Sequence, residues 1–156
     1  MVKNLDEESD TDLPDHIGWR LCQANRAWQA DFAATMRRSG HNWFTEARAG
    51  LLGHIDRKGT RQTSLIERAG ISKQAVQQLL DGLEADGVIE RAPDAADRRG
   101  KTVCYTPYGL KVLDEADRVK MEIESRYRAR VGTELFEAMM KGLRALESTH
   151  QDASGF

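Results

Sequence analysis

The chain has 156 residues, 40% hydrophobic and 31% charged, a mix typical of a single soluble, helix-rich domain. Its longest apolar runs cover only a few residues and its first residues are acidic, so we expect neither a membrane span nor a signal peptide. Cys22 and Cys104 stand alone, without a CxxC pair or a Cys/His cluster, which argues against a disulfide framework and a metal site. These features predict a cytoplasmic protein without a metal or a cofactor.

The net charge of −2 does not by itself favour a nucleic acid partner, because DNA-binding domains usually carry a basic surface. Much of the negative charge, however, lies near the N-terminus, at Asp6, Glu7, Glu8, Asp10 and Asp12. The stretch from Arg91 to Lys101 instead has four basic residues and two acidic ones. Docking depends on local charge, so this stretch is a candidate contact with phosphate.

The first part of the chain predicts two helices. After Pro14, apolar residues recur every three or four positions until Gly40 ends the pattern. Thr45 is placed to cap a second helix, whose apolar positions run to Ile55 and which Gly59 ends. Neither helix carries a motif of known chemistry.

The next segment has stronger start and stop signals. Ser64 and Glu67 fit a capping box at the start of a short helix that Gly70 ends. Ser72 is placed to cap another helix, which has a buried apolar stripe and a polar outer face and ends before Gly87. Two short helices joined by a glycine-containing turn are typical of a helix-turn-helix, whose second helix enters the major groove of DNA.

A hairpin and two further helices follow. Residues 88–91 and 102–105 are β-prone runs on either side of a long connection, which predicts a hairpin placed like a wing. Thr106 and Pro107 then fit the N-cap and the first position of a helix with a periodic apolar face. Gly132 breaks the chain before a last amphipathic helix.

Residues 85–109 closely resemble the wing region of the MarR family of bacterial regulators. In that family an Asp-x-Arg motif is followed by a strand and a Thr-x-x-Gly helix start. The residues that fill this pattern are Asp97, Arg99, Thr106 and Gly109. Residues 63–83 also resemble the family's helix-turn-helix, and the order and lengths of the six helices extend the resemblance over residues 14–148.

The resemblance implies a mostly α fold with a small β-hairpin wing (α+β), that is, a winged helix-turn-helix with long N- and C-terminal dimerisation helices. The implied domains are an acidic flexible tail (1–13), a single domain (14–148) with a winged-helix DNA-binding lobe (45–106) and dimerisation helices (14–40 and 107–148), and a flexible tail (149–156).

The resemblance also implies a sequence-specific transcription regulator, expected to be a repressor, that binds a pseudo-palindromic operator as an obligate homodimer. Many members release DNA when a small aromatic or phenolic compound binds between the dimer helices and the lobe, and others respond to cysteine oxidation. The implied partners are therefore double-stranded DNA, a second copy of the chain and a small effector. The chain has none of the motifs GxSxG, HExxH, GxxxxGK[ST] or GxGxxG, so we expect no enzymatic activity.

The polar face of the second motif helix supplies the expected contacts with base edges. Glutamine can pair with adenine through two hydrogen bonds, and such a contact discriminates between bases by about 1–3 kcal/mol. We expect this role of Gln74 and Gln78, whereas Gln77 fits it no better than it fits a solvated polar face. Arg61 and Lys73 are expected to contact phosphate, which sets register without reading sequence. The expected contacts of this region are Arg61, Ser72, Lys73, Gln74, Gln77 and Gln78.

On the wing, Arg98, Arg99 and Lys101 are expected to contact DNA. One of the two arginines would enter the minor groove, where narrow A·T tracts concentrate negative potential, and the sequence leaves open which one. The alternative is that all three are ordinary surface charges. The resemblance implies that Asp97 and Arg99 form an ion pair that shapes the wing.

The residues expected to line a ligand cavity are Trp19, Arg20, Trp28, Phe32, Trp43 and His54. All three tryptophans fall between positions 19 and 43, and an apolar slot with a few polar groups suits a small aromatic ligand. Arg20 would face a carboxylate with its planar guanidinium. The alternative for each aromatic residue is ordinary core packing.

Two other mechanisms stay open. Cys22 has the position of the sensing cysteine in the family's hydroperoxide-responsive branch, but Met36 and Glu46 stand where that branch has tyrosines, so a buried structural thiol is favoured. Cys104 is expected to contribute packing alone. A winged helix can also serve as a protein-interaction module, and salt dependence would separate this role from DNA binding, which weakens steeply as salt rises.

Overall fold

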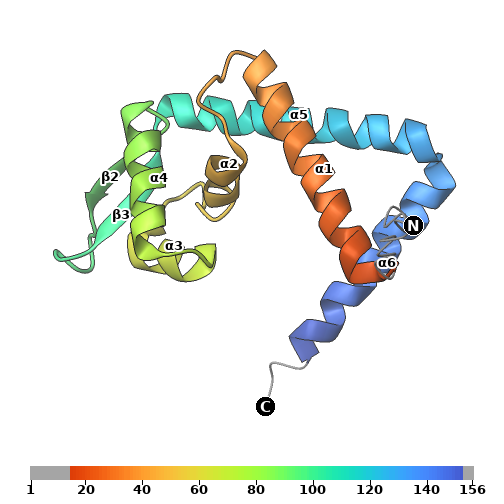
Figure 1. Cartoon of the computed structure of the whole chain (residues 1–156). Helices are drawn as coiled ribbons and strands as arrows, with labels where there is room; N and C mark the ends of the chain where they lie inside the picture. The colour runs from red at the N-terminus through yellow and green to blue at the C-terminus, as the bar shows by residue number, and fades with distance from the viewer. Residues whose placement is uncertain (1–14, 153–156) are drawn as a thin grey trace, which may run out of the picture.

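The computed structural model describes residues 15–152, and Figure 1 shows their arrangement. The chain is mostly helical with one small sheet, which confirms the predicted fold class. Its elements are α1 (Ile17–Arg38), α2 (Glu46–Leu52), β1 (Thr60–Arg61), α3 (Gln62–Ala69), α4 (Lys73–Ala85), β2 (Ile89–Pro93), β3 (Lys101–Tyr105), α5 (Pro107–Val131) and α6 (Thr133–Asp152). The predicted tail at 1–13 and residues 153–156 lie outside the described residues. α6 continues as a helix past residue 149, where a flexible tail was predicted.

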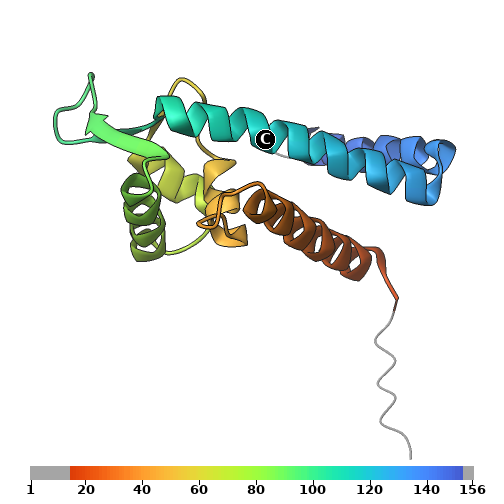
Figure 2. The ribbon, with the colours of Figure 1, turned by 90° about the horizontal axis from the view of Figure 1, so that it is seen from above.

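The short helices α2, α3 and α4 and the sheet form a lobe at one end of α5 (Figures 1 and 2). The sheet has the strand order β1-β3-β2, and both pairs are antiparallel. β2 and β3 pair along their full length, so residues 94–100 form the tip of the predicted wing. β1 was not predicted, because two residues are too few to show an alternating pattern; it pairs Thr60 with Val103.

The start and end of α4 follow from the predicted capping residues. Ser72 Oγ accepts a hydrogen bond from the backbone N–H of Ala75 at 3.1 Å, which confirms Ser72 as the N-cap. At the other end Gly87 adopts a φ of 71°, and the N–H of Val88 donates to the carbonyl of Leu83 at 2.9 Å. This is the Schellman pattern that the sequence predicted.

Two predicted helix boundaries are wrong. α3 begins at Gln62 directly after β1, so Ser64 lies inside the helix and caps nothing. α2 ends at Leu52 rather than at Gly59. The N–H of Ile55 donates to the carbonyl of Leu52 at 3.1 Å in a tight turn, and this turn buries Ile55 and directs the chain toward β1.

The hydrophobic core fills the lobe and its contact with α1 and α5. The largest fully buried side chains are those of Met36, Phe44, Leu65, Val76, Leu80, Leu83, Val88, Ile89, Val103 and Ile123. α5 meets this core in its first turn, where Gly109 packs so closely on Val88 that a Cβ would overlap the Val88 carbonyl oxygen. Thr106 Oγ1 accepts from the N–H of Gly109 at 3.0 Å and donates to the carbonyl of Gly87 at 2.5 Å. The capping residue of α5 therefore also holds the end of α4.

The long helices α1, α5 and α6 extend away from the lobe (Figures 1 and 2). α1 is buried in its C-terminal part, at Phe32, Ala33 and Met36. Ile17, at its start, is 64% exposed, and Leu135 in α6 is 62% exposed. The apolar face predicted for α1 is therefore only partly covered by the described residues of the chain itself.

Gly109→Ala should destabilise the protein even though alanine favours helices by about 1 kcal/mol. The added methyl group would overlap a backbone oxygen, which cannot rotate away, and overpacking of this kind costs about 1–3 kcal/mol. We expect the free energy of unfolding to fall by about 1 kcal/mol after the gain in helix propensity is subtracted, measured by urea denaturation at one protein concentration. Gly50→Ala is the matched control, because a Cβ there meets no atom within 4 Å. A Gly109→Ala variant as stable as this control contradicts the close contact.

Candidate nucleic-acid interface and ligand cavity

The outer face of α4 is an exposed polar row. Lys73, Gln74 and Gln78 are all exposed, so the structure brings these three predicted contacts together on one side of the lobe. Ser72 lies at the start of the row, with its hydroxyl occupied by the N-cap hydrogen bond. A row of this kind presents amide donors and acceptors together with one positive charge.

Gln77 is held differently from its neighbours. It is half-buried, and its Oε1 accepts from Gln62 Nε2 at 2.9 Å. Its own Nε2 donates to Asp81 Oδ1 at 3.2 Å. The amide of Gln77 is therefore engaged within the protein at both ends.

The shape of the wing tip depends on Asp94. This side chain is 9% exposed, and its Oδ2 pairs with Arg61 Nε at 2.7 Å while its Oδ1 accepts from the N–H of Ala96 at 2.8 Å. Asp97 accepts from the backbone N–H of Arg99 at 2.9 Å. The expected side-chain ion pair between Asp97 and Arg99 is absent among the described residues, because the Asp97 carboxylate closes a local backbone turn instead.

Arg61 thus differs from its predicted role as a free phosphate contact, since its guanidinium anchors the wing through Asp94. Its side chain stays 56% exposed, so it still lies at the surface beside the hairpin. Arg98, Arg99 and Lys101 are exposed on the hairpin, which projects from the lobe at the end opposite α6 (Figures 1 and 2). The wing is a basic projection held at its base by a partly buried ion pair.

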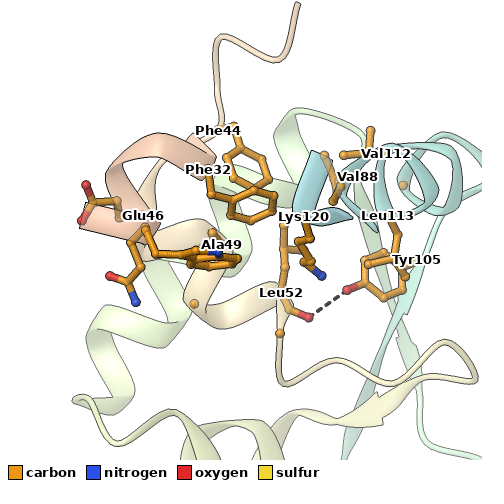
Figure 3. A pocket seen from close by; sticks show the side chains of 16 residues that line it. Phe32, Phe44, Glu46, Ala49, Leu52, Val88, Tyr105, Val112, Leu113 and Lys120 are labelled. Carbon is orange, nitrogen blue, oxygen red and sulfur yellow. Dashed lines mark hydrogen bonds between the residues drawn. The ribbon is translucent and has the colours of Figure 1, made fainter. Parts of the chain in front are cut away.

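A cavity of about 250 Å³ lies between α2 of the lobe and the long helices α1 and α5 (Figure 3). The Trp28 and Phe32 rings stack at 5.1 Å between centroids, and Phe44 meets Phe32 edge-on at 5.2 Å. Polar groups at its border include Glu46 and Lys120. The other residues around it are Gln29, Ala49, Gly50, Leu52, Gly53, Val88, Tyr105, Gly109, Val112, Leu113 and Ala116. An aromatic slot with two charged groups at its edge suits a small aromatic molecule.

Lys120 and Tyr105 supply the polar chemistry of the cavity. Lys120 Nζ lies 5.8 Å from the centroid of the Phe32 ring and 3.0 Å from Asp117 Oδ1. The Tyr105 hydroxyl donates to the carbonyl of Leu52 at 2.9 Å, as Figure 3 shows. Burial raises the pKa of Tyr105 to about 12, so its hydroxyl stays a neutral donor at physiological pH.

Of the six residues predicted to line a ligand cavity, Trp28 and Phe32 line this one. Arg20 does not line this cavity: its guanidinium pairs with Asp15 at 2.5 Å at the exposed start of α1. Trp19 is exposed on α1, 38% of its surface being accessible. Sequence reasoning missed Phe44, Tyr105 and Lys120, which reach the cavity from segments far apart in the chain.

Trp43 and His54 also lie outside the cavity. Trp43 Nε1 donates to the Tyr108 hydroxyl at 3.4 Å. That hydroxyl lies 3.3 Å from Nδ1 of His41, whose Nε2 is 2.8 Å from Glu115 Oε2. This hydrogen bond joins the loop before α2 to α5. It also lowers the pKa of Glu115, because the contact with His41 stabilises the ionised carboxylate. His54 borders a second, apolar hollow of about 220 Å³ on the other side of α2.

The cysteines have no evident shared role. Cys22 is exposed on α1 rather than buried, because the N-terminal part of α1 is uncovered, and Cys104 is half-buried in β3. Among residues 15–152 there is no cluster of His, Cys, Asp and Glu that would hold a metal ion. Within the same range, no helix has the length and apolar character to cross a membrane.

Known proteins share this sequence pattern and fold. A model of the MarR family matches residues 44–100. The transcriptional regulator HosA of Escherichia coli O127:H6 is 32% identical over 94 residues, which are 60% of this chain and 70% of HosA. A probable transcriptional regulator from Pseudomonas aeruginosa is 25% identical with a TM-score of 0.66, over 85% of this chain and 97% of that one. MepR of S. aureus, in a complex with DNA, has the same fold at 19% identity, with a TM-score of 0.66 over 87% and 99% of the two chains.

Tyr105→Phe should destabilise the protein by about 0.5–1.5 kcal/mol, because it removes one of the two hydrogen bonds to the Leu52 carbonyl and leaves only the bond from the N–H of Ile55. The measurement is urea denaturation at one protein concentration. Tyr127→Phe is the control: it removes the same hydroxyl from a half-buried tyrosine on α5 for which no hydrogen bond is described. Equal stability of the two variants would show that the Tyr105–Leu52 bond contributes nothing.

Proposed function

Because this chain belongs to the MarR family of transcription regulators, we propose that it binds double-stranded DNA as a homodimer and regulates transcription as a ligand-released repressor. The observation that carries the proposal is the exposed polar row of α4 next to a basic hairpin of the same lobe. A helix of this diameter fits the major groove, and a hairpin beside it reaches the neighbouring minor groove. The fold shared with MepR in its DNA complex supports the same docking.

The two parts of the interface would have different tasks. Gln74 and Gln78, both exposed on α4, would face base edges, where an amide can pair with adenine. Lys73, at the start of the helix, contacts phosphate, and so positions α4 without reading sequence. On the wing, Arg98 or Arg99 enters the minor groove, and Lys101 contacts the backbone.

A second copy of the chain would cover the exposed apolar residues of the long helices. Ile17 and Leu21 on α1, Met121 on α5, and Leu135 and Met139 on α6 are each at least 42% exposed. Their exposure would be unfavourable in water, and burying each such side chain stabilises by about 1.5–3 kcal/mol. We therefore assign α1, the distal half of α5, and α6 to a two-fold interface, which places two lobes on a pseudo-palindromic operator.

The cavity of Figure 3 is the proposed effector site. It lies between the lobe and the long helices, and Tyr105 at the end of the wing strand β3 forms part of its wall. A ring would stack with Trp28 and Phe32, and Lys120 would attract a carboxylate, the role that sequence analysis gave to Arg20. A bound aromatic acid would shift the lobe against α5 and so release the operator.

Gln78→Ala should relax base preference, and Lys73→Ala should not. On a site selected from a random DNA pool, we expect Gln78→Ala to cost about 1–3 kcal/mol at two mirrored base pairs. Lys73→Ala should weaken binding to the selected site and to random DNA alike, and should lower the salt slope by nearly one unit per lost phosphate contact. The measurement is a binding panel over all single-base variants of the selected site, with Lys111→Ala on α5 as the control for loss of charge. If Gln78→Ala loses the same affinity on every variant, α4 does not read bases.

The oligomeric state tests the proposed interface. We expect a dimer at micromolar concentration, with a thermal midpoint that rises with protein concentration. Leu135→Lys places a charge in the apolar face of α6 and should give a monomer, whereas Glu134→Lys, on the adjacent residue, should leave the dimer intact. Static light scattering distinguishes the two states. A wild-type monomer at micromolar concentration contradicts the interface.

The charge of Lys120 should make the effector site selective for aromatic acids. We expect 2-hydroxybenzoate to release DNA at about tenfold lower concentration than 2-hydroxybenzamide, because a charge-assisted hydrogen bond adds about 1.5 kcal/mol. Lys120→Met should abolish the difference, and Lys111→Met, which removes an exposed lysine outside the cavity, should keep it. The measurement is DNA release followed by fluorescence anisotropy. Equal potency of the acid and the amide on the wild type contradicts a role of Lys120 in binding.

A further inference from the structure

A buried guanidinium joins the wing to α4. Arg91 lies in the middle of β2, and its side chain is only 11% exposed. Its Nη2 contacts Asp81 Oδ1 at 2.7 Å and also Glu84 Oε2, and its Nε donates to the same Glu84 oxygen at 3.1 Å. Both carboxylates belong to α4, so one residue of the wing pairs with two residues of the helix that carries the polar row.

The hydrogen bonds continue from this ion cluster into the helix-turn-helix. Asp81 Oδ1, which pairs with Arg91, also accepts from Gln77 Nε2 at 3.2 Å. Gln77 Oε1 accepts in turn from Gln62 Nε2 at 2.9 Å, and Gln62 is the first residue of α3. A continuous polar chain therefore runs from the wing strand along α4 to the start of α3.

We propose that Arg91 is a positioning residue that locks the wing to α4, so that both reach DNA as one rigid unit, and that Gln77 belongs to this lock instead of reading bases. The inference rests on the proposed DNA binding and adds to it the residues that set the geometry of the two contacts. Arg91 does not itself touch DNA, because its guanidinium is buried against α4.

Stability alone does not account for this arrangement. Arg91 Nη1 and Gln62 Oε1, at the two ends of the chain of hydrogen bonds, are buried and have no partner among the described residues. Leaving buried polar atoms unpaired costs free energy, so an apolar contact would hold the strand on the helix more cheaply. What a planar guanidinium adds is geometry, since it contacts two carboxylates in one fixed orientation.

Arg91 also offsets part of the negative charge near the interface. Asp81 is 55% exposed on α4, in the turn that follows Gln77 and Gln78, where a free carboxylate would repel phosphate. The hydrogen bond with Arg91 lowers the pKa of Glu84, which keeps this partner ionised and the cluster paired at neutral pH. Arg91 thus orients the wing and offsets one of the two negative charges beside it.

A double-mutant cycle tests the lock. Arg91→Lys keeps the charge, but an ammonium cannot span two carboxylates in a fixed plane. We expect this change to reduce affinity for a site selected from a random DNA pool about tenfold when the wing is intact. In a chain that already carries Arg98→Ala, Arg99→Ala and Lys101→Ala, it should reduce affinity less than about twofold, because the wing then has none of its proposed DNA contacts left to misplace.

Two further variants separate positioning from folding. Arg48→Lys is the matched control: Arg48 pairs with Asp86 at 2.7 Å within the same lobe but does not touch the wing, so its effect should be the same in both backgrounds. Asp81→Asn removes one partner of Arg91 at a half-exposed position, and should repeat the wing-dependent loss if Arg91→Lys fails to fold. Gln77→Ala should likewise lose affinity only when the wing is intact, without relaxing preference at any base pair.

Equal losses from Arg91→Lys, or from Asp81→Asn, in both backgrounds would overturn the lock and make Arg91 a residue of the fold alone. Unchanged DNA affinity in both backgrounds would overturn it as well. These outcomes are distinct from failure of the proposed function, in which the wild-type chain enriches no sequence from the random pool and its binding has no salt dependence.

Discussion

The carbonyl oxygen of Val88 accepts from the backbone N–H of Thr106 at 3.1 Å, and Gly109 lies so close beside it that no other residue fits without displacement. The Schellman cap of α4 comes directly before this point, and β2 begins directly after it. α5 starts on the other side of the same contact, capped by Thr106. Packed backbone cannot adjust by changing rotamers. The end of α4, the first residue of β2 and the start of α5 are therefore held together at one rigid contact.

The cavity proposed as the effector site borders this junction. Val88, Tyr105 and Gly109 all border the cavity, so a molecule inside it would contact the residues that join α4, the wing and α5. The far end of α5, together with α6 and the start of α1, instead exposes apolar side chains that the proposed partner copy covers. A shift between the two ends of α5 would change the spacing of the two lobes, whereas the Arg91 cluster would keep each lobe internally rigid.

Local signals were predictable from the sequence, and long-range polar contacts were not. Ser72, Gly87 and Thr106 act within a few residues of themselves, so their caps follow from residue type and spacing. The Arg61–Asp94 pair and the Trp43–Tyr108 hydrogen bond join segments that only the fold brings together, so the sequence did not reveal that Arg61 anchors the wing or that Trp43 lies outside the cavity. Periodicity placed Trp28 and Phe32 on the correct face of α1, but Tyr105 and Lys120 reach the cavity from a strand and from another helix. A helical stripe also does not reveal which chain covers it, as the exposed Ile17 illustrates.

In the proposed complex, two copies of the lobe each place α4 in a major groove and a wing in the adjacent minor groove. The most direct test is chemical footprinting of the wild-type protein on its selected site, with methylation of guanine N7 by dimethyl sulfate as the major-groove signal and hydroxyl-radical cleavage as the minor-groove signal. The account predicts two major-groove protections whose centres lie about one helical turn apart, each flanked by a minor-groove protection. One unpaired protection, or minor-groove protection without its major-groove neighbour, would contradict it.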